Sequence, residues 1–168
     1  TRLAAPEQRF ILQHSESTLL LHDSRNAARA AQLAGDYPGL RTTLLDPIDQ
    51  WDTGTDTLAG LPELPFTPAA PRTTAAIVYT GGTTGLPKGV DLSHEALLLQ
   101  AMIDKDYFRL DDSTVFIHTA PMFHVADFTA ALGVTAAAAR HCFLPEFSPA
   151  ALLDEIEREN VDVAILVP

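Results

Sequence analysis

Cysteine is almost missing from this sequence of 168 residues, which contains Cys142 alone. A single thiol excludes an internal disulfide bond and a cysteine-ligated metal centre. The neighbours of Cys142 are mostly apolar and predict a buried structural thiol. Long apolar runs are missing too. None reaches the roughly 18 residues that cross a bilayer, and no basic start precedes an apolar segment at the N-terminus. We therefore expect a cytoplasmic protein without a transmembrane segment.

Positive charge is also scarce, because Lys and Arg number 11 against 22 for Asp and Glu, a formal net charge of -11. An acidic surface repels a phosphate backbone, so we do not expect nucleic acid as a partner. A bound polyphosphate would need a local binding arrangement that overcomes the repulsion of this acidic surface. The chain has two lysines, Lys88 and Lys105, and Lys88 lies inside a glycine-rich segment.

The rest of the composition is that of one globular domain, with 46% hydrophobic and 20% charged residues. Short apolar runs alternate with longer helical patterns, which predicts an α/β fold: layered, with a mostly parallel sheet flanked by helices. Strands are expected at 18–21, 42–45, 75–79, 90–92, 114–119, 141–144 and 161–167. Helices are expected at 6–15, 24–34, 93–108 and 125–139, and from Ser148 onward.

The segment 46–74 interrupts this pattern. It holds five of the 12 prolines and shows neither helix nor strand periodicity. We interpret it as a long Pro-rich connection within the fold that carries no chemistry, and Trp51 as a packing anchor. The chain lacks an initiator Met and stops at Pro168 directly after an apolar run, so we expect residues 1–168 to be part of a larger domain.

The most informative segment is Tyr79–Val90, which contains four glycines, three threonines and one lysine. Glycines let backbone N–H groups approach an anion and permit positive φ angles. Threonine hydroxyls can donate to phosphate oxygens or approach a metal ion, and the Lys88 ammonium adds a point charge. A flexible turn with an incidental lysine is the alternative, but the coincidence of residue types favours a phosphate-binding loop. Its predicted binding residues are Thr80, Gly81, Gly82, Thr83, Thr84, Gly85 and Lys88.

This loop differs from a Walker loop, in which the lysine follows Gly, precedes Ser or Thr, and opens a helix. Here Lys88 follows Pro87 and precedes Gly89, and Val90–Leu92 alternates like a strand. A nucleotide-hydrolysing P-loop enzyme would need a helix that begins at Lys88. A strand at Val90–Leu92 would reject that hypothesis.

Thr80–Val90 resembles the signature of the adenylate-forming superfamily, which includes acyl-CoA synthetases, peptide-synthetase adenylation domains and luciferases. Three further segments resemble parts of the same family: Asp91–His94, Ala120–His124 and Phe147–Pro168. The resemblance covers nearly the whole chain and is strongest from Ala75 onward. It identifies residues 1–168 as a partial AMP-binding N-terminal domain.

The resemblance implies that the complete protein is an ATP-dependent acid–thiol ligase of the acyl-CoA synthetase type. Such an enzyme joins a small-molecule carboxylate to the α-phosphate of ATP and then passes the acyl group to a thiol, usually coenzyme A. By resemblance, Thr80–Lys88 would hold the β- and γ-phosphates, and Lys88 would act in catalysis. Thr80 would lie near magnesium.

The same resemblance implies roles for residues after the loop. Phe123 and His124 would border the acyl pocket, with His124 acting beside the reacting carboxylate. The family commonly has Gly where this chain has Asp127, so Asp127 either reshapes the pocket or points away from it. We expect His94 to serve at the start of a helix.

Later family motifs find no match here, among them a Tyr-Gly-x-Thr-Glu segment, a ribose-binding Thr-Gly-Asp and a C-terminal lysine. We therefore expect the isolated chain to be inactive. Two alternatives stay open: a peptide-synthetase-type adenylation domain and a non-catalytic nucleotide-binding module. Gly81-Gly82 and Leu86 favour the acyl-CoA branch weakly. The sequence determines neither the carboxylic acid nor the oligomeric state.

Overall fold

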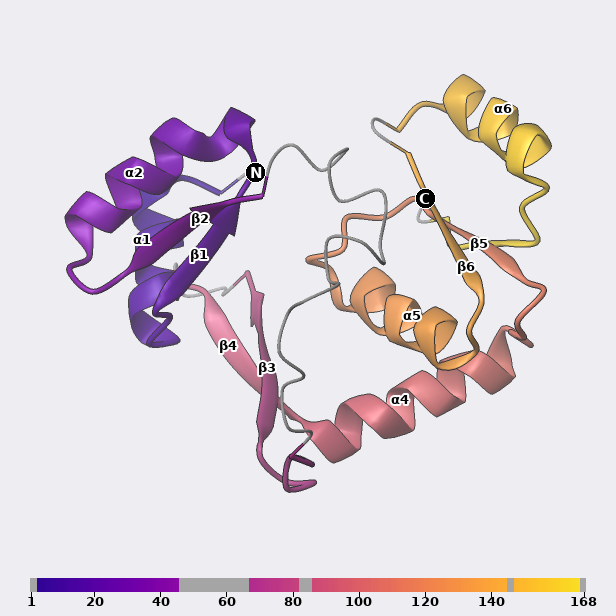
Figure 1. Ribbon diagram of the computed structural model, residues 1–168, viewed down its shortest axis with the longest axis horizontal. Coiled ribbons are helices and arrows are strands. Elements are labelled where there is room, and N and C mark those ends of the chain that lie inside the picture. The colour runs from indigo at the N-terminus through magenta and orange to yellow at the C-terminus, as the bar shows by residue number, and fades with distance from the viewer. Residues whose placement is uncertain (1–2, 46–66, 82–85, 145–146, 167–168) are drawn as a thin grey trace, which may run out of the picture. The chain divides into compact units, whose positions relative to one another are not determined.

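The computed structural model describes residues 3–45, 67–81, 86–144 and 147–166 (Figure 1). The chain forms two compact units: Thr1–Pro68 with Tyr79–Val90, and Ala69–Val78 with Asp91–Pro168. Trp51 and most of the predicted connection 46–74 lie outside the described residues. The described end of that connection, 67–73, contains no helix or strand.

In the first unit, two helices accompany a two-stranded parallel sheet. The elements in order are α1 (Ala5–His14), β1 (Leu19–His22), the 3-10 turn η1 (Ser24–Asn26), α2 (Ala27–Asp36) and β2 (Arg41–Leu44). The strands β1 and β2 pair in parallel, so β1, α2 and β2 form one βαβ crossover. Its buried side chains are those of Ala30, Leu33 and Leu40.

A hairpin carries the predicted phosphate loop. Its strands, β3 (Thr74–Thr80) and β4 (Lys88–Ser93), pair with each other in a second two-stranded sheet. The connection Gly81–Pro87 is too short for a parallel crossover, which needs a dozen residues or more, so the strands run antiparallel. Thr80 ends one strand and Lys88 begins the other, and both therefore lie at the same end of the hairpin.

In the second unit, helices and strands alternate as expected. The elements are α4 (His94–Tyr107), β5 (Val115–His118), α5 (Val125–Ala136), β6 (Arg140–Phe143), α6 (Pro149–Glu159) and β7 (Val163–Ala164). Serine side chains cap two of the helices. Ser93 Oγ accepts a hydrogen bond from Ala96 N at 3.2 Å. Ser148 Oγ accepts one from Ala151 N at 3.1 Å. Both predicted helix starts are confirmed.

The central strand of this unit, β5, lies between β6 and β7 in a parallel sheet. Helices cover both of its faces (Figure 1). Phe116 belongs to a buried cluster with Val134 of α5. Val115 and Ile117 belong to a second buried cluster with Leu152 of α6. Because α5 and α6 cover opposite faces, the strand is apolar at consecutive positions rather than at alternate ones.

The helices α4 and α5 approach each other closely at Gly133. A methyl group on Gly133 would lie 2.9 Å from Asp104 Cβ and 3.3 Å from the Ala101 carbonyl oxygen, so this approach requires glycine. Asp104 is itself buried. One of its carboxylate oxygens accepts a hydrogen bond from Gln100 Nε2 at 2.8 Å, and the other has no partner among the described residues.

The predicted α/β fold with parallel strands and flanking helices is confirmed. One feature differs from the expectation, because the strands of the described residues are divided among three small sheets. The hairpin interrupts the alternation of strand and helix, since no crossover helix joins β3 to β4. None of the helices in the described part of the chain has the length and hydropathy of a membrane-spanning segment.

Candidate functional site

The predicted phosphate loop lies at the tip of the hairpin in the first unit. The described part of the tip comprises Thr80 and Gly81 on one side and Leu86–Lys88 on the other, while Gly82–Gly85 lie outside the described residues. Lys88 is the first residue of β4, and Val90–Leu92 lie within that strand. No helix begins at Lys88, so the hypothesis of a P-loop nucleotide hydrolase is rejected.

The described residues at the tip fit an anionic ligand. Thr80, Gly81 and Lys88 are exposed. A side chain built on Gly81 would meet nothing within 4 Å, so the backbone there faces open space. In the part of the chain that the structure describes, the Lys88 ammonium forms no ion pair. A cation without a carboxylate partner beside an open glycine backbone is the arrangement that a polyphosphate requires.

A tyrosine at the base of the loop was not identified from the sequence. Tyr79 lies directly before Thr80, and its hydroxyl is 2.7 Å from His14 Nδ1 at the end of α1. The same hydroxyl lies 3.4 Å from the Ile11 carbonyl oxygen, and the Tyr79 and His14 rings meet edge to face. These contacts fix one strand of the hairpin to α1 within the first unit. Nothing in the local sequence pattern indicates this pairing, because the partners are 65 positions apart.

A second group of predicted site residues, in the second unit, follows the carboxyl end of β5. The chain leaves β5 towards α5 on one face and leaves β6 towards α6 on the opposite face. In open α/β sheets, ligands bind outside the carboxyl ends of the strands where the strand order reverses, which in the order β6-β5-β7 lies between β5 and β7. The segment Thr119–His124 follows β5 at this edge, so its position is suited to ligand binding.

Phe123 and His124 lie together on this segment. Both residues are exposed, and their ring centroids are 4.7 Å apart. His124 is the N-cap residue of α5, but its ring makes no capping hydrogen bond. Its backbone N–H donates to the Pro121 carbonyl oxygen at 2.9 Å, and its carbonyl oxygen accepts from Phe128 N at 3.0 Å. The backbone is therefore held, and the imidazole is available to a ligand.

Asp127 points into the interior of the second unit. It is fully buried, and both of its carboxylate oxygens lie 3.1 Å from His118 Nδ1. His118 Nε2 lies 2.9 Å from His141 Nδ1, and His141 Nε2 lies 3.2 Å from Thr135 Oγ1. The sequence left open whether Asp127 reshapes the pocket or points away from it, and its bonds to buried His118 favour the second possibility. Sequence reasoning found neither His118 nor His141 as its partner.

The environment of His141 alters its protonation. Burial lowers the pKa of His141, and the neighbouring His118 lowers it further, while the Asp127 carboxylate has the opposite effect. Among the described residues, no cluster of three histidine, cysteine or carboxylate side chains has the geometry of a metal site. The contacts between Asp127, His118 and His141 are therefore a hydrogen-bond network rather than a metal centre.

Cys142 is buried, as predicted. Its thiol donates to Glu155 Oε1 at 3.2 Å, and burial together with this carboxylate raises the pKa of the thiol. A raised pKa disfavours the thiolate, so Cys142 is an unreactive structural residue. His94 is the first residue of α4, which agrees with a role at the helix start.

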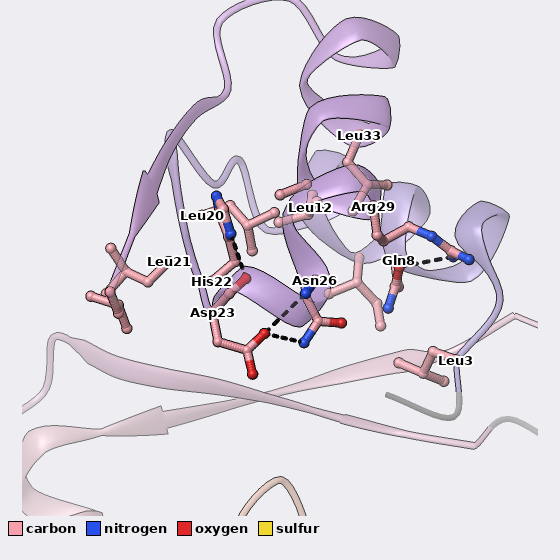
Figure 2. Close-up of a pocket in the computed structure, with 13 residues that line it drawn as sticks. Leu3, Gln8, Leu12, Leu20, Leu21, His22, Asp23, Asn26, Arg29 and Leu33 are labelled. Carbon is pink, nitrogen blue, oxygen red and sulfur yellow. Dashed lines mark hydrogen bonds between the residues drawn. The ribbon is translucent and has the colours of Figure 1, made fainter. Parts of the chain in front are cut away.

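The first unit contains a cavity of about 440 Å³ between α1, α2 and β1 (Figure 2). Leucine and isoleucine side chains form most of its wall, and the polar groups at its edge bond to one another. Asp23 accepts from Asn26, and Arg29 donates to Gln8 at 3.2 Å. None of the predicted site residues lines this cavity. It therefore supplies no part of the candidate site.

Comparisons with known proteins agree with the fold. Indoleacetate–CoA ligase of Aromatoleum aromaticum is 33% identical to the chain, with 99% of this chain and 34% of that protein covered. The salicyl-AMP ligase / salicyl-S-ArCP synthetase of Mycobacterium tuberculosis is 31% identical over 83% of this chain and 25% of its own length. Crystalline ATP-bound MatB from Rhodopseudomonas palustris superimposes with a TM-score of 0.75 at 29% identity, covering 94% of this chain and 31% of that one.

The parallel βαβ units and the glycine-rich hairpin together define an adenylate-forming N-terminal domain. The chain belongs to the AMP-binding enzyme family, whose sequence profile matches residues 1–168. It spans about a third of the length of the indoleacetate ligase and of MatB. The family resemblance seen in the sequence is confirmed.

Proposed function

We propose that this chain is the nucleotide-phosphate-binding part of an ATP-dependent ligase that activates a small-molecule carboxylate. The observation that supports this function most strongly is the exposed Lys88 ammonium, which has no ion-pair partner among the described residues and lies at the same end of the hairpin as Thr80. The proposed reaction joins a carboxylate oxygen to the α-phosphorus of ATP. The bond from that phosphorus to the bridging oxygen breaks, and pyrophosphate leaves with the electron pair.

In this proposal the loop Thr80–Lys88 holds the β- and γ-phosphates. Negative charge grows on the pyrophosphate as the bond breaks, and donors that are already oriented lower the barrier without reorganising. The glycine backbone supplies N–H groups, the threonines supply hydroxyls, and Lys88 supplies the charge. The contact of Tyr79 with α1 supports this role, because it holds the first strand of the hairpin while the tip binds ligand.

His124 and Phe123 are proposed to border the carboxylate. Their exposure beside the carboxyl end of β5 supports this assignment, as does the imidazole that no capping bond occupies. A histidine in this position can orient a carboxylate oxygen by donating a hydrogen bond to it.

Magnesium and a thiol acceptor complete the proposal. The Thr80 hydroxyl offers one oxygen ligand, and the phosphates and water would supply the remainder, because Mg²⁺ keeps several waters and substrate oxygens. Bound magnesium would neutralise charge on the phosphates. Coenzyme A is the proposed acceptor, since the indoleacetate relative is named a CoA ligase. The salicyl relative, named a salicyl-S-ArCP synthetase, supports a carrier-protein thiol as the alternative acceptor.

The test replaces one lysine at a time in the full-length protein. Lys88→Ala is expected to lower kcat/KM for carboxylate-dependent ATP–pyrophosphate exchange by about 100-fold, the loss typical of removing one transition-state donor. Lys105→Ala, the matched control on α4, is expected to change it less than about twofold. Equal activity of both variants would contradict the assignment of Lys88, whereas no exchange by the wild-type protein itself would favour a non-catalytic module.

A second measurement concerns the chain by itself. We expect no exchange by residues 1–168 alone, with any of short, long and aromatic acids. The same panel applied to the full-length protein would identify the carboxylate. Exchange by the isolated chain would show that the catalytic groups lie entirely within it.

A further inference from the structure

The segment Thr119–His124, which joins β5 to α5, has an exposed tip. Met122, Phe123 and His124 are all exposed. Among the described residues, the contacts at the tip are short-range: His124 N donates to Pro121 O, and the Phe123 ring lies against the His124 ring. The tip therefore depends on its two ends for its position.

The first end is held by a hydrogen bond to the neighbouring strand. The Thr119 hydroxyl donates to the carbonyl oxygen of Ile165, which follows β7 directly. This bond joins the residue after β5 to the chain after β7. It leaves the direction of the tip beyond Thr119 undetermined.

The second end is held by Asp127, which lies in the first turn of α5 and bonds back to His118, the last residue of β5. The hydrogen bond between these two side chains therefore joins the two ends of the connection between strand and helix. Both are almost inaccessible to water, with exposed fractions of 5% for His118 and 0% for Asp127. A contact that is shielded from water keeps its strength and its geometry.

The donor and acceptor roles of the heavy atoms in this network determine where its protons lie. The Thr135 hydroxyl donates to the Ala131 carbonyl oxygen at 2.8 Å, so it must accept from His141 Nε2. Neutral His141 then accepts at Nδ1, and His118 donates from Nε2. His118 Nδ1 faces only the two Asp127 oxygens, and one further proton lies between them.

With that proton on His118, the contact is an imidazolium–carboxylate pair. With the proton on Asp127, it is a neutral pair of an imidazole and a carboxylic acid. The titratable groups that face His118 within the described residues are Asp127 on α5 and His141 on β6. The remaining faces of His118 meet the rings of Phe116 and Phe143.

Resting on the proposed function, we propose that Asp127 and His118 are a positioning pair that fixes the tip of Thr119–His124 and so sets the affinity for the carboxylate substrate. Among the described residues, the hydrogen bonds of the pair do not involve the side chains of the tip. Its effect is specific to one substrate: loosening the pair displaces His124 and Phe123 and leaves the hairpin unchanged. A displacement of about 1 Å in a binding group can cost up to about 100-fold.

The chain offers a matched control in Asp104. This carboxylate is also buried in the second unit, but it bonds to Gln100 within α4 and has no bond to the β5–α5 connection. Asp104→Asn and Asp127→Asn therefore make the same chemical change at two buried positions of one unit. Only Asp127→Asn weakens the hydrogen bond that joins the two ends of the connection.

The kinetic experiment measures KM for carboxylate and for ATP in the full-length protein. We expect Asp127→Ala to raise KM for carboxylate about tenfold and Asp127→Asn, which retains an acceptor for His118, about threefold. KM for ATP should change less than about twofold in both variants, and Asp104→Asn should leave both values unchanged. A purely structural role would lower the amount of active enzyme and leave KM alone. Unchanged KM for carboxylate in Asp127→Asn overturns the proposal, whether or not Asp127→Ala folds.

Amide hydrogen exchange tests the positioning without any activity. The Phe128 N–H, which bonds to His124 O, should exchange about tenfold faster in Asp127→Asn than in the wild-type protein, and at the wild-type rate in Asp104→Asn. Equal rates in both variants overturn the positioning role. If the wild-type protein shows no carboxylate-dependent exchange of pyrophosphate, the proposed function fails separately, and the amide rates still decide whether the pair positions the segment.

Discussion

Polar groups are exposed at the hairpin tip in the first unit and buried at the end of β5 in the second unit. At the tip, Lys88 and Gly81 are exposed, and no described carboxylate pairs with the lysine. At the end of β5, His118 and Asp127 are buried and satisfy each other. The polar groups at the tip are left exposed to solvent, whereas those at the strand end bond to one another within the fold.

This difference has an energetic consequence. An exposed charge is solvated by water, so its removal changes the free energy of unfolding little. Removing one partner of a buried charged pair leaves the other without compensation and is strongly destabilising. Substitutions at the tip should therefore affect activity, and substitutions at the end of β5 should affect stability first.

The largest expected effect on stability follows from Asp127→Ala. It leaves His118 buried without a partner for Nδ1, and we expect a loss of about 3–5 kcal/mol in the free energy of unfolding. Urea unfolding of the full-length protein measures it. Asp104→Asn is the comparison, because it removes a carboxylate oxygen that has no partner among the described residues, and it should be neutral or stabilising. Equal losses in the two variants would contradict the importance of the pair.

A smaller effect is expected where α4 meets α5. Gly133→Ala would place a methyl group 2.9 Å from Asp104 Cβ, and overpacking of this kind costs about 1–3 kcal/mol. Gly35→Ala on α2 is the matched control, since a methyl group there meets nothing within 4 Å. It should be neutral or slightly stabilising. Thermal unfolding of both variants is the measurement. A loss of stability in Gly133→Ala alone would show that crowding at that position, and not alanine as such, is destabilising.

The next prediction concerns pH. Burial lowers the pKa of folded His141, so between that value and the unfolded value of about 6.5 the unfolded chain binds more protons. The contribution of His141 to stability is complete above about pH 6.5 and is lost as the pH falls through the lowered pKa. Unfolding measured from pH 7 to 5.5 should show a smaller fall for His141→Asn than for the wild-type protein. Parallel curves would contradict the role of burial.

Three carboxyl groups with lowered pKa values titrate below the pH range of this measurement. The pKa values of Asp23 and Asp111 are lowered from 3.8 by hydrogen bonds to side chains nearby. Bonding to Arg158 lowers the pKa of Glu155 from 4.5. Their contributions to stability are lost at lower pH, below the range in which His141 is titrated.

The smallest effect on stability is expected at the tip itself. Lys88→Ala should change the free energy of unfolding by less than about 0.5 kcal/mol, because the side chain is exposed and unpaired within the described residues. Thermal unfolding in the absence of nucleotide measures it. With ATP present, the wild-type protein should be stabilised more than the variant, because the lysine contributes to the binding of ATP and not to the fold. A large loss without nucleotide would show that Lys88 supports the fold.

Several features of the fold were predictable because their cause is local. The helices after Ser93 and Ser148 begin where a serine can cap them. The strand β4 follows from the alternation of Val90–Leu92 and from the departure of Lys88 from the Walker pattern. The buried Cys142 follows from its apolar neighbours. Each prediction needed only residues that are close together in the chain.

Other features were not predictable because they join distant segments. The contact of Tyr79 with His14 spans 65 positions, and the contact of His118 with His141 spans 23. From the sequence, Asp127 was a departure from the family pattern with two possible directions. Only the packing of α5 on β5 shows that it points to His118, since a polar side chain is stable in the interior only with a partner.

The sequence by itself determined the family and the α/β class, since the glycine- and threonine-rich segment that carries the family resemblance is formed by neighbouring residues. The tertiary structure alone decided which polar groups satisfy one another. It pairs Asp127 with His118 and leaves Lys88 exposed. The physical reason is that the cost of burial depends on the three-dimensional surroundings of a charge, which local sequence does not contain.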